Sequence, residues 1–488
     1  MDNLILVPIF FPIISGILVK ILNLENRKTR QIYLSTVVIL NGIILFFVLR
    51  MGDMSKEVFN IGNFLNISFQ IDGVSKIFTA LASFLWICST FYSFEYMKHE
   101  GEEIRYFTFS LITLGIIIGL GFAGNLFTFY MFYEFMTLVT FPLVIHSMTR
   151  DSMKAGIKYL IYSFIGASLV LVGIIFVYYY SNSFNFNSSG ILDLGKINGK
   201  ENLLLIIYLL TIIGFGSKAG MFPLHNWLPT AHPIAPAPAS GLLSGIITKA
   251  GVLGILRTTY FVYGAEFIRG TWVHNAILVL IIFTIFMGSM MAYKSKLLKE
   301  RLAYSSISQV SYVLFGLMLL NDQGFIGGIL HMIFHGFIKN ILFLSVGAII
   351  YKTGKTKVDE IKGIGKSMPI TMWCFTLASL ALVGIPPLSG FISKWYLGMG
   401  GLKLENQILG TIGTVVLLIS ALLTGGYLIP IFSSGFFPGE EFDYTKVKKL
   451  DPNNFMIIPL MLLTIGVVVF GMFPNTLVGL ILSINNGM

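Results

Sequence analysis

The stretch NLLLIIYLLTIIGFGSKAGMFP, residues 202–223, is an apolar run that closes with a lysine, a glycine and a proline. A run of about 18 or more apolar residues predicts a membrane-spanning helix, because about 20 residues at about 1.5 Å each cross the hydrocarbon core. Similar runs recur throughout the 488 residues, of which 55% are hydrophobic and only 11% are charged. A soluble chain of this length would carry far more surface charge. The sequence therefore predicts an all-α polytopic membrane protein.

The apolar runs predict about fourteen transmembrane helices. Their approximate boundaries are 3–24, 31–50, 75–97, 106–122, 125–147, 157–180, 202–222, 238–262, 272–293, 302–320, 325–351, 367–396, 406–432 and 455–483. The first run lacks a basic leader and a small-residue cleavage site, so we expect it to be a retained span. Cys88 and Cys374 lie within apolar runs and indicate neither a disulfide framework nor a metal cluster.

Lysine and arginine residues divide unequally between alternate loops. One set of loops holds 20 of them, Lys299 and Arg301 included, whereas the other set holds only 5, namely Lys56, Lys196, Lys200, Arg269 and Lys403. Cytoplasmic loops carry the excess of basic residues, so the first set is predicted to be cytoplasmic. Both termini then face outward, and the net charge of +10 reflects membrane orientation and not nucleic-acid binding.

Seven ionisable residues inside the predicted spans are singled out because they cannot be assigned to loops: Glu134, Lys218, Lys249, His331, His335, Lys339 and Lys394. A charge at mid-membrane costs roughly 3 kcal/mol, so we expect these side chains to be paired, hydrated or neutral. Two alternatives stay open for part of the set. His335 and Lys339 can snorkel toward an interface or cap a helix contact, and Lys394 can lie near the end of its span.

His331, His335 and Lys339 follow one another at i, i+4 and i+8, which places them on one helical face. Two histidines four residues apart can bind zinc, but no thiolate is near and HMIFH lacks the glutamate of HExxH. We therefore predict no metal site. Imidazole titrates near neutral pH, and a dry environment makes a lysine release its proton more readily. The stripe favours a hydrated proton relay.

The pattern GFGSK at residues 214–218 returns as GFISK at residues 390–394. Prolines stand beside both, in AGMFP after the first and in GIPPLS before the second. Proline inside a span breaks the helix, and matching broken spans in two halves point to a transport site between inverted repeats. We therefore expect broken helices at the seventh and twelfth spans.

Five spans separate the two lysines of these patterns, which predicts two inverted five-helix units. The corresponding division of the chain is 1–100 for helices 1–3, 101–265 for the first repeat (helices 4–8), 266–435 for the second repeat (helices 9–13) and 436–488 for helix 14. The proline-dense stretch HPIAPAPAS, residues 232–240, is interpreted as a short cytoplasmic connection into the eighth helix. Whether His225 and His232 have a function stays open at this point.

Four stretches carry a family resemblance: PLHNWLPTAHPIAPAPASGLLSG, LAYSSISQVSY, HMIFHGFIKNILF and GIPPLSGFISKW. They resemble the antiporter-like membrane subunits of respiratory complex I, of Mrp-type cation/proton antiporters and of membrane-bound hydrogenases. The matching motifs run from about Asp72 to Lys394, which is most of the chain. The resemblance implies fourteen helices with two inverted repeats, no redox cofactor in this subunit, and a water-filled polar axis at mid-membrane.

The resemblance also implies roles for individual residues. Glu134 on the fifth helix matches the glutamate that pairs with the seventh-helix lysine, here Lys218. Lys249 matches the eighth-helix lysine that carries protons inward, and the eleventh-helix histidines and lysine match His331, His335 and Lys339. Lys394 matches the residue at the outer half-channel. The short C-terminus and Lys394 look most like the D subunit of an Mrp-type antiporter, located in a bacterial or archaeal cytoplasmic membrane.

Several functions follow as hypotheses. The first is a proton-translocating subunit in a complex of membrane subunits, with H⁺ and possible Na⁺ exchange, and its variant is a redox-driven pump. The second is a pathway for Na⁺ itself, which the single glutamate and several cations disfavour because Na⁺ prefers oxygen ligands. The third is a structural scaffold with vestigial polar residues. A self-contained enzyme is disfavoured because no nucleophile–base set or cofactor motif is present.

Overall fold

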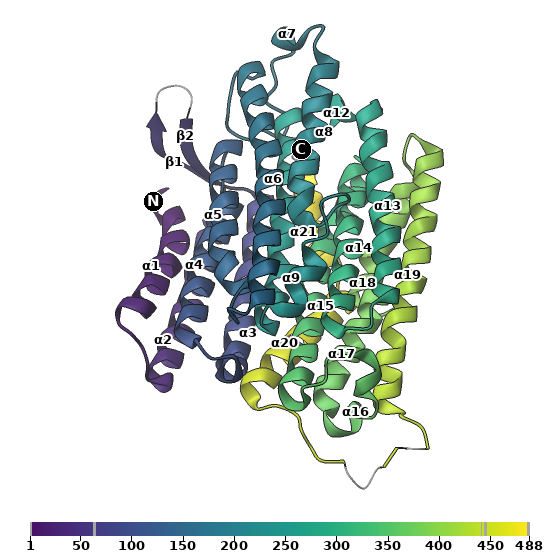
Figure 1. Ribbon diagram of the computed structural model, residues 1–488. Helices are drawn as coiled ribbons and strands as arrows, with labels where there is room; N and C mark the ends of the chain where they lie inside the picture. The colour runs from purple at the N-terminus through teal and green to yellow at the C-terminus, as the bar shows by residue number, and fades with distance from the viewer. Residues whose placement is uncertain (1, 62–64, 441, 444–446, 486–488) are drawn as a thin grey trace.

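The computed structural model describes residues 2–61, 65–440, 442–443 and 447–485. Most of this part of the chain is helical, and the helices lie roughly parallel in one bundle (Figure 1). The helices of the N-terminal half are η1 (Asp2–Leu6), α1 (Val7–Ile21), α2 (Arg27–Arg50), α3 (Gly73–Glu100), α4 (Glu103–Gly121), α5 (Leu126–Val144), α6 (Arg150–Tyr180), α7 (Leu194–Ile197), α8 (Glu201–Ala219), α9 (Leu228–Ile234), α10 (Ala237–Leu242), η2 (Leu243–Ile247), α11 (Thr248–Leu256) and η3 (Arg257–Tyr263). Those of the C-terminal half are α12 (Ala265–Ile268), α13 (Trp272–Lys294), α14 (Leu298–Met318), α15 (Asp322–Thr353), η4 (Val358–Ile361), α16 (Ile364–Ser367), α17 (Pro369–Val383), α18 (Ser389–Leu402), α19 (Gln407–Phe436), α20 (Asn454–Met472) and α21 (Asn475–Asn485).

The predicted spans correspond to helices of the structure. Among the described residues, 12 helical segments are long and apolar enough to cross a membrane. The two other predicted spans fall on α14, which is more polar, and on the pair α17 and α18, each of which is too short to cross alone. The prediction of an all-α polytopic membrane protein is confirmed.

The structure has a helix break at the end of the predicted seventh span and another within the predicted twelfth span. α8 is continuous from Glu201 to Ala219 and long enough to cross a membrane by itself, and it is followed by a turn over residues 220–227 and the short helix α9. The twelfth span consists of α17, a break at residues 384–388 and α18. The breaks occur where prolines withdraw backbone donors and the ring clashes with the preceding turn. Lys218 lies just before the first break, whereas Lys394 lies after the second.

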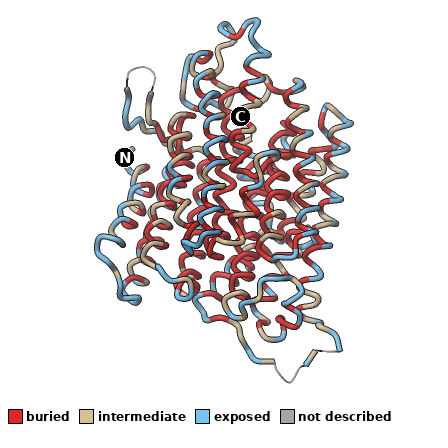
Figure 2. Tube along the Cα trace, in the orientation of Figure 1, coloured by how far each residue is buried: buried red, intermediate tan, exposed pale blue. Residues whose placement is uncertain are grey.

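Two helical segments occupy the centre of the bundle. The π-interrupted span Ala237–Tyr263 is buried along all of its most apolar window, and α15 is buried along 94% of its own. In α2, by contrast, only 33% of the most apolar stretch is buried, because this helix lies at the periphery of the bundle (Figure 2). Because the central segments are covered by other helices and not by lipid, polar side chains on them meet protein groups.

The stretch at residues 232–240, predicted as a short connection into the eighth helix, is more ordered and more deeply buried than a surface connection would be. Most of it is helical, in α9 and α10, and nearly all of it is buried, with only Pro233 and Ile234 partly exposed. The Ser240 hydroxyl donates to the backbone carbonyl of His232 at 2.9 Å, which satisfies a carbonyl that proline leaves without its helical partner. The prolines therefore shape a buried helix–turn–helix in the bundle core.

A β-hairpin occupies one of the predicted loops. β1 (Met54–Ile61) pairs antiparallel with β2 (Leu65–Ile71), and the register shifts between Glu57 and Phe59. The hairpin lies at the same end of the bundle as α7 and the C-terminus, whereas α16 and the connection after α19 lie at the opposite end (Figure 1). These strands were not predicted from the sequence pattern.

Candidate functional site

Lys218 is held at the C-terminal end of α8 by neutral side chains from two neighbouring helices. Its Nζ donates to Thr137 of α5 at 2.9 Å, and to Tyr159 and Ser163 of α6 at 3.1 and 2.8 Å. The amine also lies 4.5 Å from the Tyr159 ring centroid. The side chain is fully buried, so hydroxyl oxygens and a ring face replace water around the nitrogen.

Glu134 does not form the expected ion pair with Lys218 in this structure. Among the described residues no carboxylate lies within 4.0 Å of the Lys218 amine. The half-buried Glu134 remains within electrostatic range of Lys218, and its Oε1 has no hydrogen-bond partner. The lysine bonds to hydroxyls instead because α5 presents Thr137, one turn beyond Glu134, to it.

α8 and α11 come into backbone contact beside the next lysine. A Cβ atom at Gly251 would lie 2.5 Å from the Phe215 carbonyl oxygen and 2.7 Å from the Ala219 backbone nitrogen, so only glycine fits there. Lys218 immediately precedes Ala219, and Lys249 lies two residues before Gly251. No hydrogen bond among the described residues joins the two lysines, and a proton crossing between them needs water or side-chain motion.

Lys249 contacts His335 across the centre of the bundle. Its Nζ lies 2.6 Å from His335 Nδ1, and it also donates to the backbone carbonyl of Ser244 in η2. All three side chains are buried. The Nε2 atom of His335 has no partner. The two residues come from segments 86 positions apart, and their contact creates a direct path from the first half of the chain to the second.

The two histidines of α15 lie in sequence along the same path. The His331 and His335 rings stack with centroids 6.0 Å apart. His331 Nδ1 lies 2.9 Å from Ser393 Oγ of α18, and its Nε2 lies 3.1 Å from Gln309 Oε1 of α14. Because Ser393 immediately precedes Lys394, this contact links the central helix to the second broken span.

Tyr312 of α14 lies between His331 and Lys394. Its ring stacks on His331 with centroids 5.3 Å apart, and Lys394 Nζ lies 5.2 Å from the same ring. Lys394 Nζ donates to the carbonyls of Leu382 and Val383 at 2.7 and 2.9 Å. These carbonyls close α17, so the lysine satisfies a helix C-terminus and its dipole favours the positive charge.

Lys339 lies on the same side of α15 and bonds to α14. Its Nζ donates to the carbonyl of Leu302 at 3.0 Å and to Ser305 Oγ at 2.8 Å. Both His335 and Lys339 are 0% exposed, so neither snorkels to an interface. The structure brings Lys249, His331 and His335 into one connected group, with Lys339 and Lys394 bordering it and with Lys218 and Glu134 beyond the α8–α11 contact.

One buried charged pair was not among the residues predicted from the sequence. Arg257 lies within the predicted span 238–262 and is 1% exposed. Its guanidinium forms a bidentate ion pair with Asp72 at 2.5 and 2.9 Å and also donates to Ser75. An arginine inside an apolar run was a visible signal, because such residues are costly and paired.

One basic residue that the sequence placed in a loop, Lys299, lies inside a helix in the structure. Lys299 is only 7% exposed, because α14 begins at Leu298 and not at residue 302. Its Nζ donates to the carbonyl of Ala235 at 2.9 Å. The buried His232 stacks on Phe343 with centroids 4.9 Å apart, and neither of its ring nitrogens has a partner. The predicted start of this span at residue 302 was too late, because the basic residues before it were interpreted as loop residues.

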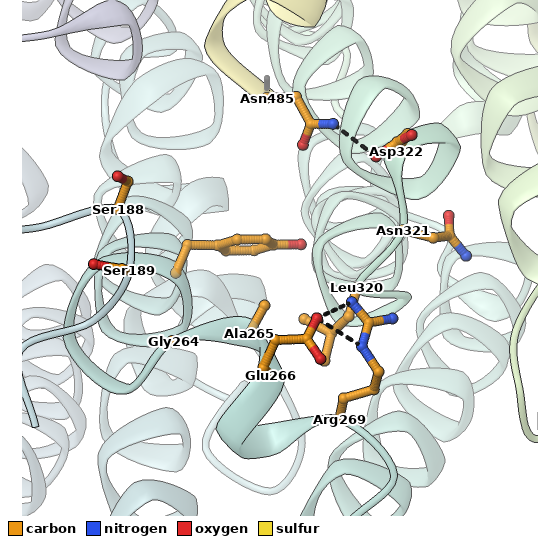
Figure 3. A pocket seen from close by; sticks show the side chains of 11 residues that line it. Ser188, Ser189, Gly264, Ala265, Glu266, Arg269, Leu320, Asn321, Asp322 and Asn485 are labelled. Atoms are coloured by element: carbon orange, nitrogen blue, oxygen red, sulfur yellow. Dashed lines mark hydrogen bonds and ion pairs between the residues drawn. The ribbon is translucent and has the colours of Figure 1, made fainter. Parts of the chain in front are cut away.

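An open cavity of about 350 Å³ lies at the end of the bundle that carries α12 and the start of α15 (Figure 3). Glu266 and Arg269 pair across one side of it at 3.0 Å, and Asn485 bonds to Asp322 at 2.8 Å on another. None of the seven sequence-predicted site residues lines it. Within the described residues no group of three or more His, Cys, Asp or Glu side chains is arranged to hold a metal ion.

Two models of known protein families match this chain. Residues 123–420 match the family model described as NADH:quinone oxidoreductase/Mrp antiporter, TM, and residues 59–107 match that of NADH-Ubiquinone oxidoreductase (complex I), chain 5 N-terminus. The chain belongs to the NADH:quinone oxidoreductase/Mrp antiporter family. The resemblance drawn from the sequence motifs is confirmed.

Curated members of this antiporter family match over most of the chain. The N subunit of the NADH-quinone oxidoreductase of Desulforudis audaxviator is 29% identical over 84% of this chain and 83% of its own length. The D subunit of the Na(+)/H(+) antiporter of Alkalihalophilus pseudofirmus is 28% identical over 95% of this chain and 93% of its own.

Two solved structures share the fold. A chain of the archaeal membrane-bound sulfane sulfur reductase matches with a TM-score of 0.86 at 21% identity, covering 99% of this chain and 97% of that one. A chain of the Mrp complex from a Dietzia species matches with a TM-score of 0.84 at 19% identity, covering 98% and 96%.

Proposed function

We propose that this chain is the proton-translocating membrane subunit of a multisubunit cation/proton antiporter that exchanges Na⁺ for H⁺. The observation that carries the proposal is the buried contact between Lys249 Nζ and His335 Nδ1 at 2.6 Å, continued by the His335–His331 ring stack. Two titratable groups placed this close in a dry core cannot both hold a charge at low cost. A proton on one of them therefore tends to move to a neighbour.

The chemistry of each side chain fits a relay. Lys249, Lys339 and Lys218 hold a proton at Nζ, and their partners here are hydroxyls, carbonyls and an imidazole nitrogen. His335 and His331 accept a proton at one ring nitrogen and release it at the other. Neutral partners leave each lysine free to lose its charge, whereas a tight carboxylate partner would fix it.

Glu134 supplies the electrostatic control in this proposal. Its carboxylate favours a charged Lys218 when the two approach, and this influence weakens when Lys218 turns to Thr137, Tyr159 and Ser163. The structure has the second arrangement. A change in the Glu134–Lys218 distance then moves the lysine between holding and releasing its proton, and Lys394 passes protons toward the outer side.

Direct conduction of Na⁺ along the same axis fits the side chains poorly. Na⁺ is coordinated by carboxylate, carbonyl and hydroxyl oxygens, and the axis presents lysine and histidine nitrogens with one half-buried carboxylate, Glu134. Bringing Na⁺ past several amines that take up protons costs repulsion energy. The cation therefore crosses elsewhere in the complex, in another membrane subunit.

A second candidate is the same relay driven by a redox partner. The M subunit of the NADH-quinone oxidoreductase of Rickettsia bellii is 28% identical over 99% of this chain and 98% of its own length, which is as broad as the antiporter match. Mild-detergent purification separates the two candidates. A quinone-site or hydrogenase subunit in the purified complex favours the redox pump, and small membrane subunits alone favour the antiporter.

Replacing Lys218 tests the function directly. In inside-out membrane vesicles that contain the whole complex, Lys218→Ala is expected to abolish Na⁺-dependent quenching of a pH-sensitive dye while the complex still assembles. The partly exposed Lys76→Ala is the matched control and keeps wild-type transport, because within the described part of the chain its amine forms an ion pair with the exposed Asp53 and with no other carboxylate. Normal transport by Lys218→Ala, or by a Glu134→Ala, Lys249→Ala double variant, would support a structural scaffold instead.

We also propose that both termini face the outer side of a bacterial or archaeal cytoplasmic membrane. The proposal rests on the basic residues gathered in alternate loops, and the α7 end and the C-terminus lie together at one end of the bundle (Figure 1). The two inverted units, 101–265 and 266–435, belong to the same proposal. A membrane-impermeant thiol reagent should label a cysteine introduced at Ser189 in intact cells and leave one at Lys355 unlabelled, and the reverse pattern contradicts this orientation.

A further inference from the structure

Tyr427 of α19 contacts the relay although α19 carries none of the predicted site residues. The side chain is 1% exposed, and its Oη donates to Ser305 Oγ of α14 at 2.8 Å. The same Oη lies 3.3 Å from Thr424 Oγ1, one turn earlier on α19. Ser305 Oγ is also the hydroxyl that accepts from Lys339 Nζ at 2.8 Å. A chain of hydroxyls therefore runs from Lys339 into α19.

The far end of this chain has a fixed direction. Thr424 Oγ1 donates its own proton to the carbonyl of Ser420 at 2.7 Å, so its lone pairs are free to accept from Tyr427. Arg301 holds the Tyr427 backbone carbonyl at 2.8 Å, which anchors the tyrosine against α14. Tyr427 thus has two acceptors within reach of one hydroxyl proton, Ser305 on one side and Thr424 on the other.

Simple hydrogen-bond chemistry assigns one of the two acceptors to each protonation state of Lys339. A neutral amine can accept a hydrogen bond, so Tyr427 donates to Ser305 and the Ser305 hydroxyl donates to the amine. A charged ammonium only donates, so Ser305 accepts from it, turns its own proton to Tyr427 Oη, and Tyr427 donates to Thr424. In either state the Ser305 and Tyr427 hydroxyl protons each have an acceptor, which avoids the cost of a buried unsatisfied donor.

We propose that Tyr427 is a positioning residue that keeps Ser305 hydrogen-bonded to Lys339 whether or not Lys339 carries a proton. The inference rests on the proposed function, in which Lys339 takes up and releases protons. Other titratable groups in electrostatic range of Lys339 are Lys249, His335 and His232. Among the described residues, Ser305 Oγ is hydrogen-bonded to Lys339 and Tyr427 and to none of those three groups.

Tyr427→Phe removes one oxygen and leaves the ring in place. The Ser305 hydroxyl then loses its acceptor in the charged state but keeps the lysine amine as its acceptor in the neutral state. The variant therefore penalises protonated Lys339, and the pH at which transport is half-maximal on its alkaline side should fall by about 0.5 to 1 unit. Thr424→Val, which removes the second acceptor of Tyr427, should shift the midpoint in the same direction.

Transport is measured as dye quenching across a pH series in vesicles that contain the whole complex, with the amount of assembled complex determined in parallel. Tyr260→Phe is the matched control, because its buried hydroxyl donates to the Leu317 carbonyl at 2.8 Å and to no other group among the described residues, and it should leave the midpoint unchanged. In a Ser305→Ala background, Tyr427→Phe should add no further shift, since the tyrosine acts through that serine.

An unchanged midpoint in Tyr427→Phe, with or without a loss of assembled complex, overturns the proposal and leaves the proposed function standing. A shift of equal size in the Ser305→Ala background also overturns it, because the tyrosine would then act by another route. Failure of the proposed function gives a different result, in which the wild-type complex moves no protons at any pH.

Discussion

The buried pair of Arg257 and Asp72 gives the sharpest prediction for stability. Arg257→Met keeps the length and apolar stem of the side chain but removes the guanidinium. The pair is bidentate, and Arg257 and Asp72 are 1% and 18% exposed. The guanidinium also packs over the rings of Phe186 and Phe261 at 5.1 and 4.6 Å, which ties the loop before α7 to the start of α3.

The expected loss is large because the variant leaves a carboxylate without its counter-charge. Removing one partner of a buried pair costs about 3–5 kcal/mol, whereas an exposed pair contributes about 0–1 kcal/mol. Lys76 and Asp53 form such an exposed pair, at 28% and 77% exposure. Asp72 Oδ1 also accepts from the Ser75 backbone nitrogen at 2.8 Å and caps α3, and Arg257→Met preserves this cap.

The free energy of unfolding is measured on the purified protein in mixed micelles of increasing denaturing detergent. The free energy of unfolding should fall several times more in Arg257→Met than in Lys76→Met. The double variant Asp72→Asn, Arg257→Met should recover part of the loss, because asparagine still caps the helix but carries no charge. The reasoning is refuted if Arg257→Met is no more destabilising than Lys76→Met, or if the double variant is less stable than the single one.

Two further predictions concern the relay and the contact between its halves. His335→Gln keeps a hydrogen-bond acceptor for Lys249 but cannot pass a proton, so vesicle transport should fall by about tenfold or more with assembly unchanged, and wild-type flux would exclude the imidazole from the path. Gly251→Val adds a Cβ atom that would lie 2.5 Å from the Phe215 carbonyl oxygen, so the variant should lose about 1–3 kcal/mol of stability. An unchanged thermal unfolding temperature would show that α8 and α11 can separate freely.

The sequence predicted the membrane fold because a bilayer imposes the same demand on every crossing. Each span needs about 20 apolar residues, and each charge within a span stands out because of its cost. Lys218, Lys249 and Lys394 were identified on that basis. The breaks in the seventh and twelfth spans were likewise visible, since proline cannot donate a backbone hydrogen bond wherever it occurs.

The partners of those charges were decided only by the packing of helices distant in the chain. The family resemblance implied an ion pair between Glu134 and Lys218, yet the amine bonds to Thr137 and Ser163, 81 and 55 positions away. Helix rotation and separation set which side chain reaches another, and a sequence pattern contains neither. The burial of residues 232–240 and the place of Tyr427 beside Ser305 arise in the same way, because local composition fixes what crosses the membrane and three-dimensional packing fixes what each crossing touches.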